Sequence, residues 1–242
     1  VVIAPDAEWS IRVVDLGASS VNLGAGLALD VTRTLASTGQ FLLKRAFDVT
    51  CVLVALPVWA PVVGLCALLT WLDDRHAPFY RQERIGRGGR PLQVLKLRTM
   101  VPNAEAALRA HLEADPAARA EWEKHFKLTK DPRITRYGQV FRKLSLDELP
   151  QLVNVLGGSM SLVGPRPLPS YHHEALPPSI ALLRTKALPG MTGLWQVEGR
   201  SDTDLHGMAT LDMAYVRNWS VWEDLVILAR TVLVVLKGKG AY

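Results

Sequence analysis

Two adjacent acidic residues, Asp147 and Glu148, offer the clearest chemistry in this sequence of 242 residues. They precede Pro150, which can lie only near a helix start because it lacks an N–H and clashes with a preceding turn. The pattern predicts Asp147 as the N-cap, Glu148 as the first helical residue and Pro150 at the third helical position. The helix dipole would then favour the ionised form of both carboxylates. An ionised aspartate can attack phosphorus, and an ionised glutamate can hold a divalent cation.

The same residues also have a purely structural interpretation. Ser145 and Glu148 have the Ser-x-x-Glu spacing of a capping box, and acidic residues in a first helical turn often serve only as caps. Nearby cations favour the chemical interpretation, because Arg142 and Lys143 lead directly into the carboxylate pair.

A further cation, Arg166, stands between Pro165 and Pro167. The two prolines restrict the backbone on both sides, and a guanidinium held in this way can donate two parallel hydrogen bonds to a phosphate. A simple turn remains the alternative for a single Pro-Arg-Pro sequence. Residues 188–202 form a second candidate loop, rich in glycine with aromatic and basic residues. They could clamp a nucleotide by stacking and backbone donors, or form a hydrophobic turn without a ligand.

The elements that must position these residues include a basic hairpin. Residues 78–85 and 91–98 have strand-like composition, and the glycine-rich segment 86–89 separates them. Lys96 and Arg98 would lie on one face, although basic strand residues are often only solvated. The packing candidates in the second strand are Leu92, Val94 and Leu97.

Residues 49–72 form a run of 24 consecutive residues without a charge, which is long enough to span the roughly 30 Å hydrocarbon core of a bilayer. Pro57 and Pro61 predict a kink within it. Basic residues flank both ends, beginning with the pair at 44–45 that we expect to mark a cytoplasmic flank. Cations on both flanks favour a helix that turns back to the face it entered. The alternative is a buried central helix of a soluble protein.

Other helical patterns suggest supporting elements. Residues 103–126 predict a pair of surface helices without chemistry, with Asp115 as the N-cap of the second. Residues 221–236, together with Trp219 and Trp222, suit a helix at the membrane interface. Adjacent histidines on a helix face different ways, so we expect the Tyr-His-His-Glu sequence at 171–174 to be surface and not a metal cluster.

Composition limits the class of partner. The net charge is +5, with 28 Lys and Arg residues, which suits a partner carrying phosphates: nucleic acid, an anionic membrane surface or a nucleotide sugar. The two cysteines, Cys51 and Cys66, lie within the apolar run and are expected to be small packing residues in a reducing compartment. The chain opens on Val1 without a basic n-region, which suggests part of a longer protein without a signal peptide.

Seven ordered motifs between residues 41 and 242 resemble the bacterial sugar transferase family, the monotopic polyprenol-phosphate phosphoglycosyl transferases. They are Lys44-Arg45-x-Phe47-Asp48, the proline-broken apolar run, Arg81-Gln-Glu83-Arg-Ile-Gly86, Lys96-Leu-Arg98-Thr99-Met100, Leu146-Asp147-Glu148-Leu-Pro-Gln-Leu, Gly164-Pro-Arg-Pro167 and Gly193-Leu-Trp-Gln196. The chain departs from many members in having Ala60 where they have serine before the helix-breaking proline, and Pro57 is an additional proline.

The resemblance implies an α/β, mostly α, membrane-associated fold. Residues 1–40 would be the end of a preceding α/β nucleotide-fold-like domain, as in the family's large forms. Residues 41–75 would be a re-entrant membrane helix, and residues 76–242 a compact cytoplasmic catalytic domain with a C-terminal interfacial helix. The expected location is the cytoplasmic face of the bacterial inner membrane.

The resemblance also implies transfer of a hexose 1-phosphate from a UDP-sugar to undecaprenyl phosphate, releasing UMP. This would be the first membrane step of exopolysaccharide, capsule or O-antigen synthesis. Asp147 would form a covalent aspartyl phosphosugar, and Glu148 would bind Mg²⁺. The implied phosphate-binding residues are Lys96, Arg142 and Arg166. The implied nucleotide or substrate loop residues are Arg98, Gly193, Trp195, Gln196 and Arg200.

The expected partners are a UDP-sugar, undecaprenyl phosphate and membrane lipids, without nucleic acid, and a homo-oligomer is left open. Two rival functions are weighed against the transferase. One is a membrane-surface scaffold for glycan assembly, which binds anionic lipid through the basic hairpin and does no chemistry. The other is a lipid phosphate hydrolase, in which water resolves the aspartyl intermediate. The carboxylate pair and its cations argue against the scaffold, and acceptor dependence of turnover would identify the hydrolase.

Overall fold

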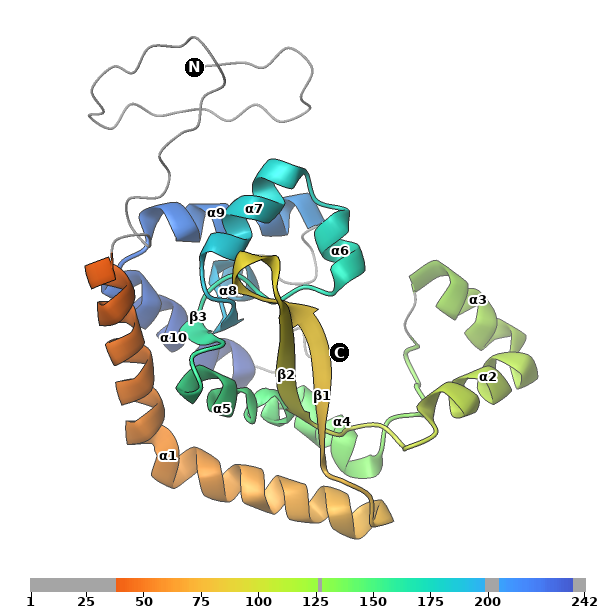
Figure 1. The fold of residues 1–242 in the computed structure, drawn as a ribbon. Helices are drawn as coiled ribbons and strands as arrows, with labels where there is room; N and C mark the ends of the chain where they lie inside the picture. Colours follow the sequence, from red (N-terminus) through yellow and green to blue (C-terminus); the bar gives the residue numbers. More distant parts are fainter. Residues whose placement is uncertain (1–37, 126–127, 199–204, 237–242) are drawn as a thin grey trace, which may run out of the picture. The chain divides into compact units, whose positions relative to one another are not determined.

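A computed structural model describes residues 38–125, 128–198 and 205–236 (Figure 1). Most of these residues are helical, and the strands within the described ranges form two small two-stranded sheets. The mostly helical α/β class predicted from the sequence is therefore confirmed, whereas the expectations for residues 1–37 lie outside the described part.

The elements in chain order are α1 (Thr38–Asp74), β1 (Phe79–Ile85), η1 (Arg87–Gly89), β2 (Pro91–Leu97), α2 (Ala104–Ala114), α3 (Pro116–His125), α4 (Arg136–Lys143), η2 (Leu146–Glu148), α5 (Gln151–Leu156), β3 (Ser161–Val163), α6 (Ser170–Glu174), α7 (Pro178–Lys186), β4 (Gly190–Thr192), α8 (Leu194–Glu198), α9 (Leu205–Asn218) and α10 (Val221–Leu236).

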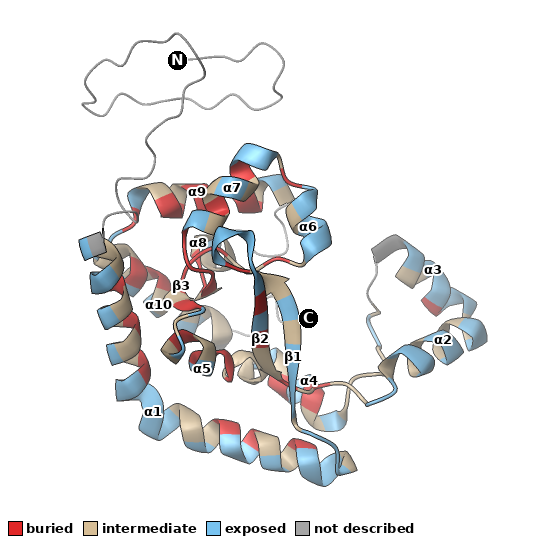
Figure 2. Cartoon of the chain, in the orientation of Figure 1, coloured by how far each residue is buried: buried red, intermediate tan, exposed pale blue. Residues whose placement is uncertain are grey.

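The apolar run lies within α1, a helix of 37 residues that bends sharply (Figure 1). Pro57 and Pro61 lie inside it, and each removes a backbone hydrogen bond, which accounts for the bend. Among the described residues, Gly39–Asp74 is the one helix long and apolar enough to cross a membrane. Only 17% of its most apolar window is buried against the protein, and Figure 2 shows exposed residues along much of its length. Such exposure excludes the buried central helix of a soluble protein and is compatible with membrane association.

A buried polar network attaches the N-terminal part of α1 to α9 and α10. The Lys44 ammonium lies 2.6 Å from an Asp224 carboxylate oxygen and 3.7 Å from Asp48. Asp224 also accepts hydrogen bonds from the Tyr215 hydroxyl at 2.8 Å and the Trp219 indole at 3.1 Å. Lys44 is thus buried, which its position beside an apolar run did not suggest. The expectation for Trp219 was wrong, because this side chain is buried within the protein and not at a membrane interface.

The neighbouring Arg45 also contacts the rest of the protein, at the end of α5. Its guanidinium donates to the carbonyl oxygens of Val155 at 2.8 Å and of Leu156 and Met160 at 3.4 Å. These carbonyls lie at and just beyond the C-terminal end of α5, where helical carbonyls lack intrahelical partners. Arg45 therefore caps α5 from α1, a role that its position beside an apolar run did not suggest.

The basic hairpin is confirmed. Strands β1 and β2 pair antiparallel, with Phe79 opposite Leu97 and Ile85 opposite Pro91. Gly88 and Gly89 have φ values of 68° and 73° in the turn, a conformation that favours glycine. The predicted packing residues Leu92, Val94 and Leu97 are all buried.

The paired surface helices are confirmed as α2 and α3. The Asp115 carboxylate accepts from the backbone N–H groups of Ala117 at 2.9 Å and Ala118 at 3.2 Å, which makes Asp115 the N-cap of α3. The C-terminal apolar helix is confirmed as α10, and Trp222 on it is exposed.

A short parallel pair, β3 and β4, supports the loop that carries Arg166. Gly164 immediately follows β3 and packs directly against Gly190, the first residue of β4. A Cβ atom on either glycine would collide with the backbone of the other strand or of its flanking loop. The sheet therefore requires glycine at these positions, and it places Arg166 beside the carboxylate pair.

Candidate active site

The two carboxylates lie in η2, a single 3-10 turn between α4 and α5. Helix α5 begins only at Gln151, with Pro150 as the residue that precedes it. The prediction that Asp147 is the N-cap and Glu148 the first helical residue was therefore wrong by one turn. Ser145 has φ 55° and ψ 24°, and its side chain makes no capping hydrogen bond, so the capping box is also excluded. Proline tolerates both placements because its fixed φ fits a helix start and a turn equally well.

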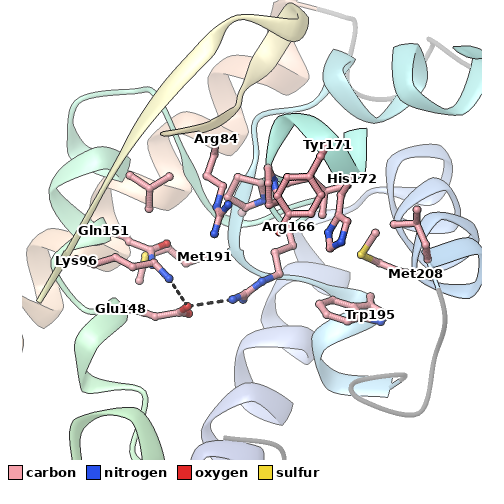
Figure 3. Close-up of a pocket in the computed structure, with 16 residues that line it drawn as sticks. Arg84, Lys96, Glu148, Gln151, Arg166, Tyr171, His172, Met191, Trp195 and Met208 are labelled. Atoms are coloured by element: carbon pink, nitrogen blue, oxygen red, sulfur yellow. Dashed lines mark hydrogen bonds and ion pairs between the residues drawn. The ribbon is translucent and has the colours of Figure 1, made fainter. Parts of the chain in front are cut away.

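Glu148 is held between two cations from distant parts of the chain. Its Oε1 accepts from the Lys96 ammonium at 3.0 Å and from the Arg166 guanidinium at 3.1 Å (Figure 3). Burial disfavours the carboxylate, but Arg166 and Lys96 outweigh it and lower the pKa of Glu148 to about 2. Glu148 is therefore ionised at any physiological pH, as the sequence predicts.

Asp147 has the opposite electrostatic environment. Burial and the neighbouring Glu148 charge raise the pKa of Asp147 to about 6, while Lys96 and Arg142 oppose the shift. The expectation that both carboxylates are stabilised in the ionised form was thus correct for Glu148 and wrong for Asp147. Two adjacent carboxyls with separated pKa values can take different chemical roles.

Beside this pair lies a cavity of about 530 Å³, within the range typical of small-molecule sites (Figure 3). One side is charged and polar. Its residues are Arg84, Lys96, Glu148, Gln151 and Arg166. The other side is aromatic and sulfur-containing. Its residues are Tyr171, His172, Trp195 and Met208, whereas Met191 lies beside Gln151 and Lys96 (Figure 3).

The predicted phosphate-binding residues converge on the carboxylates. Lys96 and Arg166 line the cavity, whereas Arg142 is not among its lining residues. Arg142 donates to the Thr99 hydroxyl at 2.9 Å and acts on Asp147 through its charge. A fourth cation, Arg84, also lines the cavity, and it was not predicted as a site residue. Burial and the nearby Arg166 lower the pKa of Arg84.

Strand alternation could have revealed Arg84. In the observed register Tyr80 pairs with Lys96. Arg84 lies four residues beyond Tyr80 in β1, so it shares a face with Lys96. Once Lys96 is assigned to the site, the period of two places Arg84 there as well.

Of the residues predicted to form the nucleotide or substrate loop, only some lie at the cavity. Trp195 lines the cavity. Arg98 instead binds Asp74 through both terminal nitrogens, at 2.5 and 2.6 Å, and is not among the residues lining the cavity. Gly193 packs against the Gly164 carbonyl, and the Gln196 amide donates to the Met191 carbonyl at 2.9 Å, so both hold the loop together. Arg200 lies outside the described residues.

The sequence 171–174 forms α6 at the mouth of the cavity. Tyr171 is exposed, as expected, yet both Tyr171 and His172 line the cavity, which the surface assignment did not foresee. Within the described ranges no group of three or more His, Cys, Asp or Glu residues could hold a metal ion.

Glu148 fits Mg²⁺ as a single carboxylate ligand and not as part of a complete cage. Mg²⁺ is often held by one or two carboxylates together with substrate phosphates and water. Glu148 uses Oε1 for Lys96 and Arg166, and its Oε2 lies outside these two interactions. Glu148 is thus the residue that would hold the ion, with phosphate oxygens and water completing its ligands.

Comparison with known proteins places this geometry in a family. Residues 39–238 match the family described as bacterial sugar transferase. The chain is 46% identical over 216 residues to a UDP-galactose-lipid carrier transferase of Erwinia amylovora, a match that covers 89% of this chain and 45% of that protein. It is 43% identical to the exopolysaccharide production protein ExoY of Sinorhizobium fredii, covering 82% of this chain and 88% of the relative.

A third relative is the UDP-glucose:undecaprenyl-phosphate glucose-1-phosphate transferase of Caulobacter vibrioides, which is 40% identical over 82% of this chain and 72% of its own length. The chain thus spans less than half the length of the Erwinia protein but most of the Sinorhizobium protein. The family match covers the long apolar helix, the hairpin and every described residue of the candidate site. The chain therefore belongs to the bacterial sugar transferase family.

Proposed function

We propose that the protein transfers a hexose 1-phosphate from a UDP-sugar to undecaprenyl phosphate and releases UMP. The observation that carries this proposal is the arrangement of Glu148 between Lys96 and Arg166, beside Asp147 with its raised pKa and a cationic cavity. Relatives named as transferases of galactose or glucose to lipid carriers support the same reaction class. We expect the product to enter exopolysaccharide, capsule or O-antigen synthesis.

The reaction proceeds in two displacements at one phosphorus atom. A carboxylate oxygen of Asp147 attacks the phosphorus that carries the sugar, and the anhydride bond to UMP breaks with its electron pair leaving on UMP. An oxygen of undecaprenyl phosphate then attacks the same phosphorus, and the bond to Asp147 breaks and restores the carboxylate. With a pKa of about 6, Asp147 is ionised at pH 7 and yet more basic than an ordinary aspartate.

The cations stabilise charge on the phosphate oxygens during both steps. Lys96, Arg84 and Arg166 line the cavity, and Arg142 lies close enough for its charge to oppose the rise in the pKa of Asp147. Positive groups held in place stabilise the developing charge without reorganisation. Mg²⁺ held by Glu148 would supply further charge neutralisation at the phosphates.

We propose that α1 is re-entrant and that the catalytic unit lies at the cytoplasmic face of the inner membrane. Both ends of α1 bind the same catalytic unit: Lys44 contacts Asp224, and Asp74 contacts Arg98. A helix that crossed the bilayer would place its ends on opposite sides, so these two contacts favour a helix that enters and leaves by one face. In this arrangement α10, with exposed Trp222, suits the interface.

The decisive experiment is UMP release from a panel of UDP-sugars, with Mg²⁺ and undecaprenyl phosphate, by the protein in lipid nanodiscs. Wild type is compared with Asp147→Asn and Glu148→Gln. We expect multiple-turnover release that requires the lipid phosphate and that is lost in both variants, whereas the first displacement alone releases at most one UMP per protein without the lipid. Release that persists in Asp147→Asn would contradict the covalent mechanism. Multiple-turnover release without the lipid acceptor would indicate hydrolysis.

A further inference from the structure

We infer that the wall formed by Tyr171, His172, Trp195 and Met208 binds the nucleobase of the leaving nucleotide, and not the transferred sugar. This inference rests on the proposed function and assigns the two sides of the cavity to different parts of the donor. The wall is contributed by three elements, α6, α8 and α9. It is hereafter called the aromatic wall.

The charged side of the cavity has the composition of a diphosphate site. Three cations, Arg84, Lys96 and Arg166, face one carboxylate, Glu148, which leaves positive charge unbalanced inside the cavity. Arg84 and Arg166 are close enough for their charges to interact unfavourably. A bound diphosphate would relieve this repulsion, because its oxygens can accept hydrogen bonds from both guanidiniums.

The aromatic wall has the composition of a site for a flat ring. The centroids of the Tyr171 and His172 rings are 4.5 Å apart, and the rings meet edge to face. Trp195 lies on the same side of the cavity as His172 and Met208 (Figure 3). Aromatic rings and thioethers stabilise a base by stacking and dispersion, without reading its polar edge.

The shapes of the two donor groups distinguish base from sugar. Figure 3 shows Trp195, His172 and Met208 across the cavity from Glu148, with Arg166 between them. A nucleobase is flat and presents π-faces for stacking, whereas a hexose presents mainly hydroxyl groups that need hydrogen-bond partners. With the diphosphate bound at Arg166, the aromatic wall therefore suits the nucleobase better than the sugar.

The test measures the dissociation constants of UMP and of inorganic phosphate for the nanodisc-embedded protein, by calorimetry. Trp195→Ala removes the largest ring of the aromatic wall. We expect it to weaken UMP binding about tenfold or more, and phosphate binding by less than about twofold. Trp222→Ala is the matched control, because this exposed tryptophan on α10 does not line the cavity and should leave both constants unchanged.

Turnover with different UDP-sugars separates failure of this inference from failure of the proposed function. If Trp195→Ala leaves UMP affinity unchanged but alters the preference among UDP-sugars, the wall binds the sugar and the inference is overturned. An unchanged UMP affinity with unchanged preference overturns it as well. If the wild type releases no UMP from any donor, the proposed function fails, while UMP binding in the two variants still tests the assignment of the wall.

A separate observation assigns positioning roles to Arg184 and Asp212. Arg184 on α7 donates to one Asp212 carboxylate oxygen at 2.9 and 2.7 Å, and both side chains are buried. The same guanidinium donates to the backbone carbonyl of Arg166 at 2.9 Å. We propose that this ion pair fixes the backbone of Arg166 and thereby aims its guanidinium at Glu148 and the donor phosphates.

A double-mutant cycle tests the positioning role through the dissociation constant of UDP. Arg184→Lys keeps the positive charge but removes the guanidinium that donates both to Asp212 and to the Arg166 carbonyl. We therefore expect this variant to bind UDP about tenfold more weakly in the wild-type background. In the Arg166→Ala background the same substitution should change binding less than about twofold, because the group that it positions is gone. The melting temperature should fall equally in both backgrounds. Equal losses of UDP affinity in both backgrounds would reduce Arg184 to a purely structural residue.

Discussion

Asp147 and Glu148 are neighbours in the chain, yet their surroundings move their pKa values in opposite directions. Both carboxylates are partly buried, but hydrogen bonds from Lys96 and Arg166 reach only Glu148. Glu148 then becomes a fixed negative charge that makes Asp147 harder to ionise. The division of roles between a permanent anion and a more basic nucleophile follows from which residue the two cations reach.

The pH dependence of turnover should report Asp147. The nucleophile must be ionised, and its pKa is about 6, so we expect kcat/KM to fall below pH 6, tenfold for each further pH unit. Initial rates of UMP release between pH 4.5 and 8 provide the measurement. A profile that stays flat down to pH 4.5 would contradict a nucleophile with this pKa.

The same shift predicts that Asp147→Asn stabilises the protein. A carboxyl whose pKa is raised from 3.8 to about 6 favours folding below pH 3.8, and this contribution is lost as the pH rises through 6. At pH 8 the variant should exceed the wild type by at most about 3 kcal/mol, and near pH 4 the difference should vanish. Thermal unfolding at the two pH values measures it, and equal stabilities at pH 8 would argue against the raised pKa.

Lys96 should matter for rate more than for folding. Its ammonium is 3.0 Å from Glu148 and lines the cavity, so Lys96→Met removes both a partner of Glu148 and a stabiliser of phosphate charge. We expect kcat to fall by about 10²-fold. Lys143→Met, at an exposed lysine that does not line the cavity, is the matched control in the same UMP assay.

At the scale of elements, Asn154 connects α5 to the hairpin. Its side chain donates to the Gln93 carbonyl at 2.8 Å and accepts from the Leu95 N–H at 3.0 Å, in the manner of a pairing strand. This contact holds the helix that follows the carboxylates against the strand that carries Lys96.

We expect Asn154→Ala to reduce the free energy of unfolding by about 1–3 kcal/mol, because two strand groups lose their partner. Turnover should fall as well, since Lys96 and Glu148 are no longer held together. Denaturant unfolding measures the first effect and UMP release the second. Val153→Ala, at an exposed position of the same helix, should change neither appreciably.

The elements that the sequence predicts well are those with local signals. The hairpin has a glycine turn between apolar and basic strands, and the Asp115-Pro116 sequence marks a helix start, so both were predicted. The 3-10 turn was missed because Pro150 is compatible with a helix that begins at Glu148 and also with one that begins at Gln151. The buried contact of Lys44 was not predicted because its partner Asp224 lies 180 residues away, and no local pattern encodes such a contact.

At the scale of the whole molecule, the Lys44 and Asp224 pair joins the beginning of the described chain to its last helix. Removal of one partner leaves an uncompensated buried charge. We therefore expect Lys44→Met to cost about 3–5 kcal/mol, and the double variant Lys44→Met/Asp224→Leu to recover part of that loss. Unfolding in nanodiscs tests both variants. A double variant no more stable than Lys44→Met would show that Asp224 contributes mainly through Tyr215 and Trp219.

The attachment of α1 at both ends limits how this protein can be engineered. Arg45 caps α5, Lys44 holds α10, and Asp74 binds Arg98 just beyond the strand that carries Lys96, so residues of the apolar helix support the elements around the cavity. We expect deletion of the helix to weaken these supports. We also expect that a generic apolar helix of equal length and hydropathy, without Lys44, Arg45 and Asp74, would not restore turnover. The apolar helix is therefore a structural support of the candidate site as well as an apolar segment.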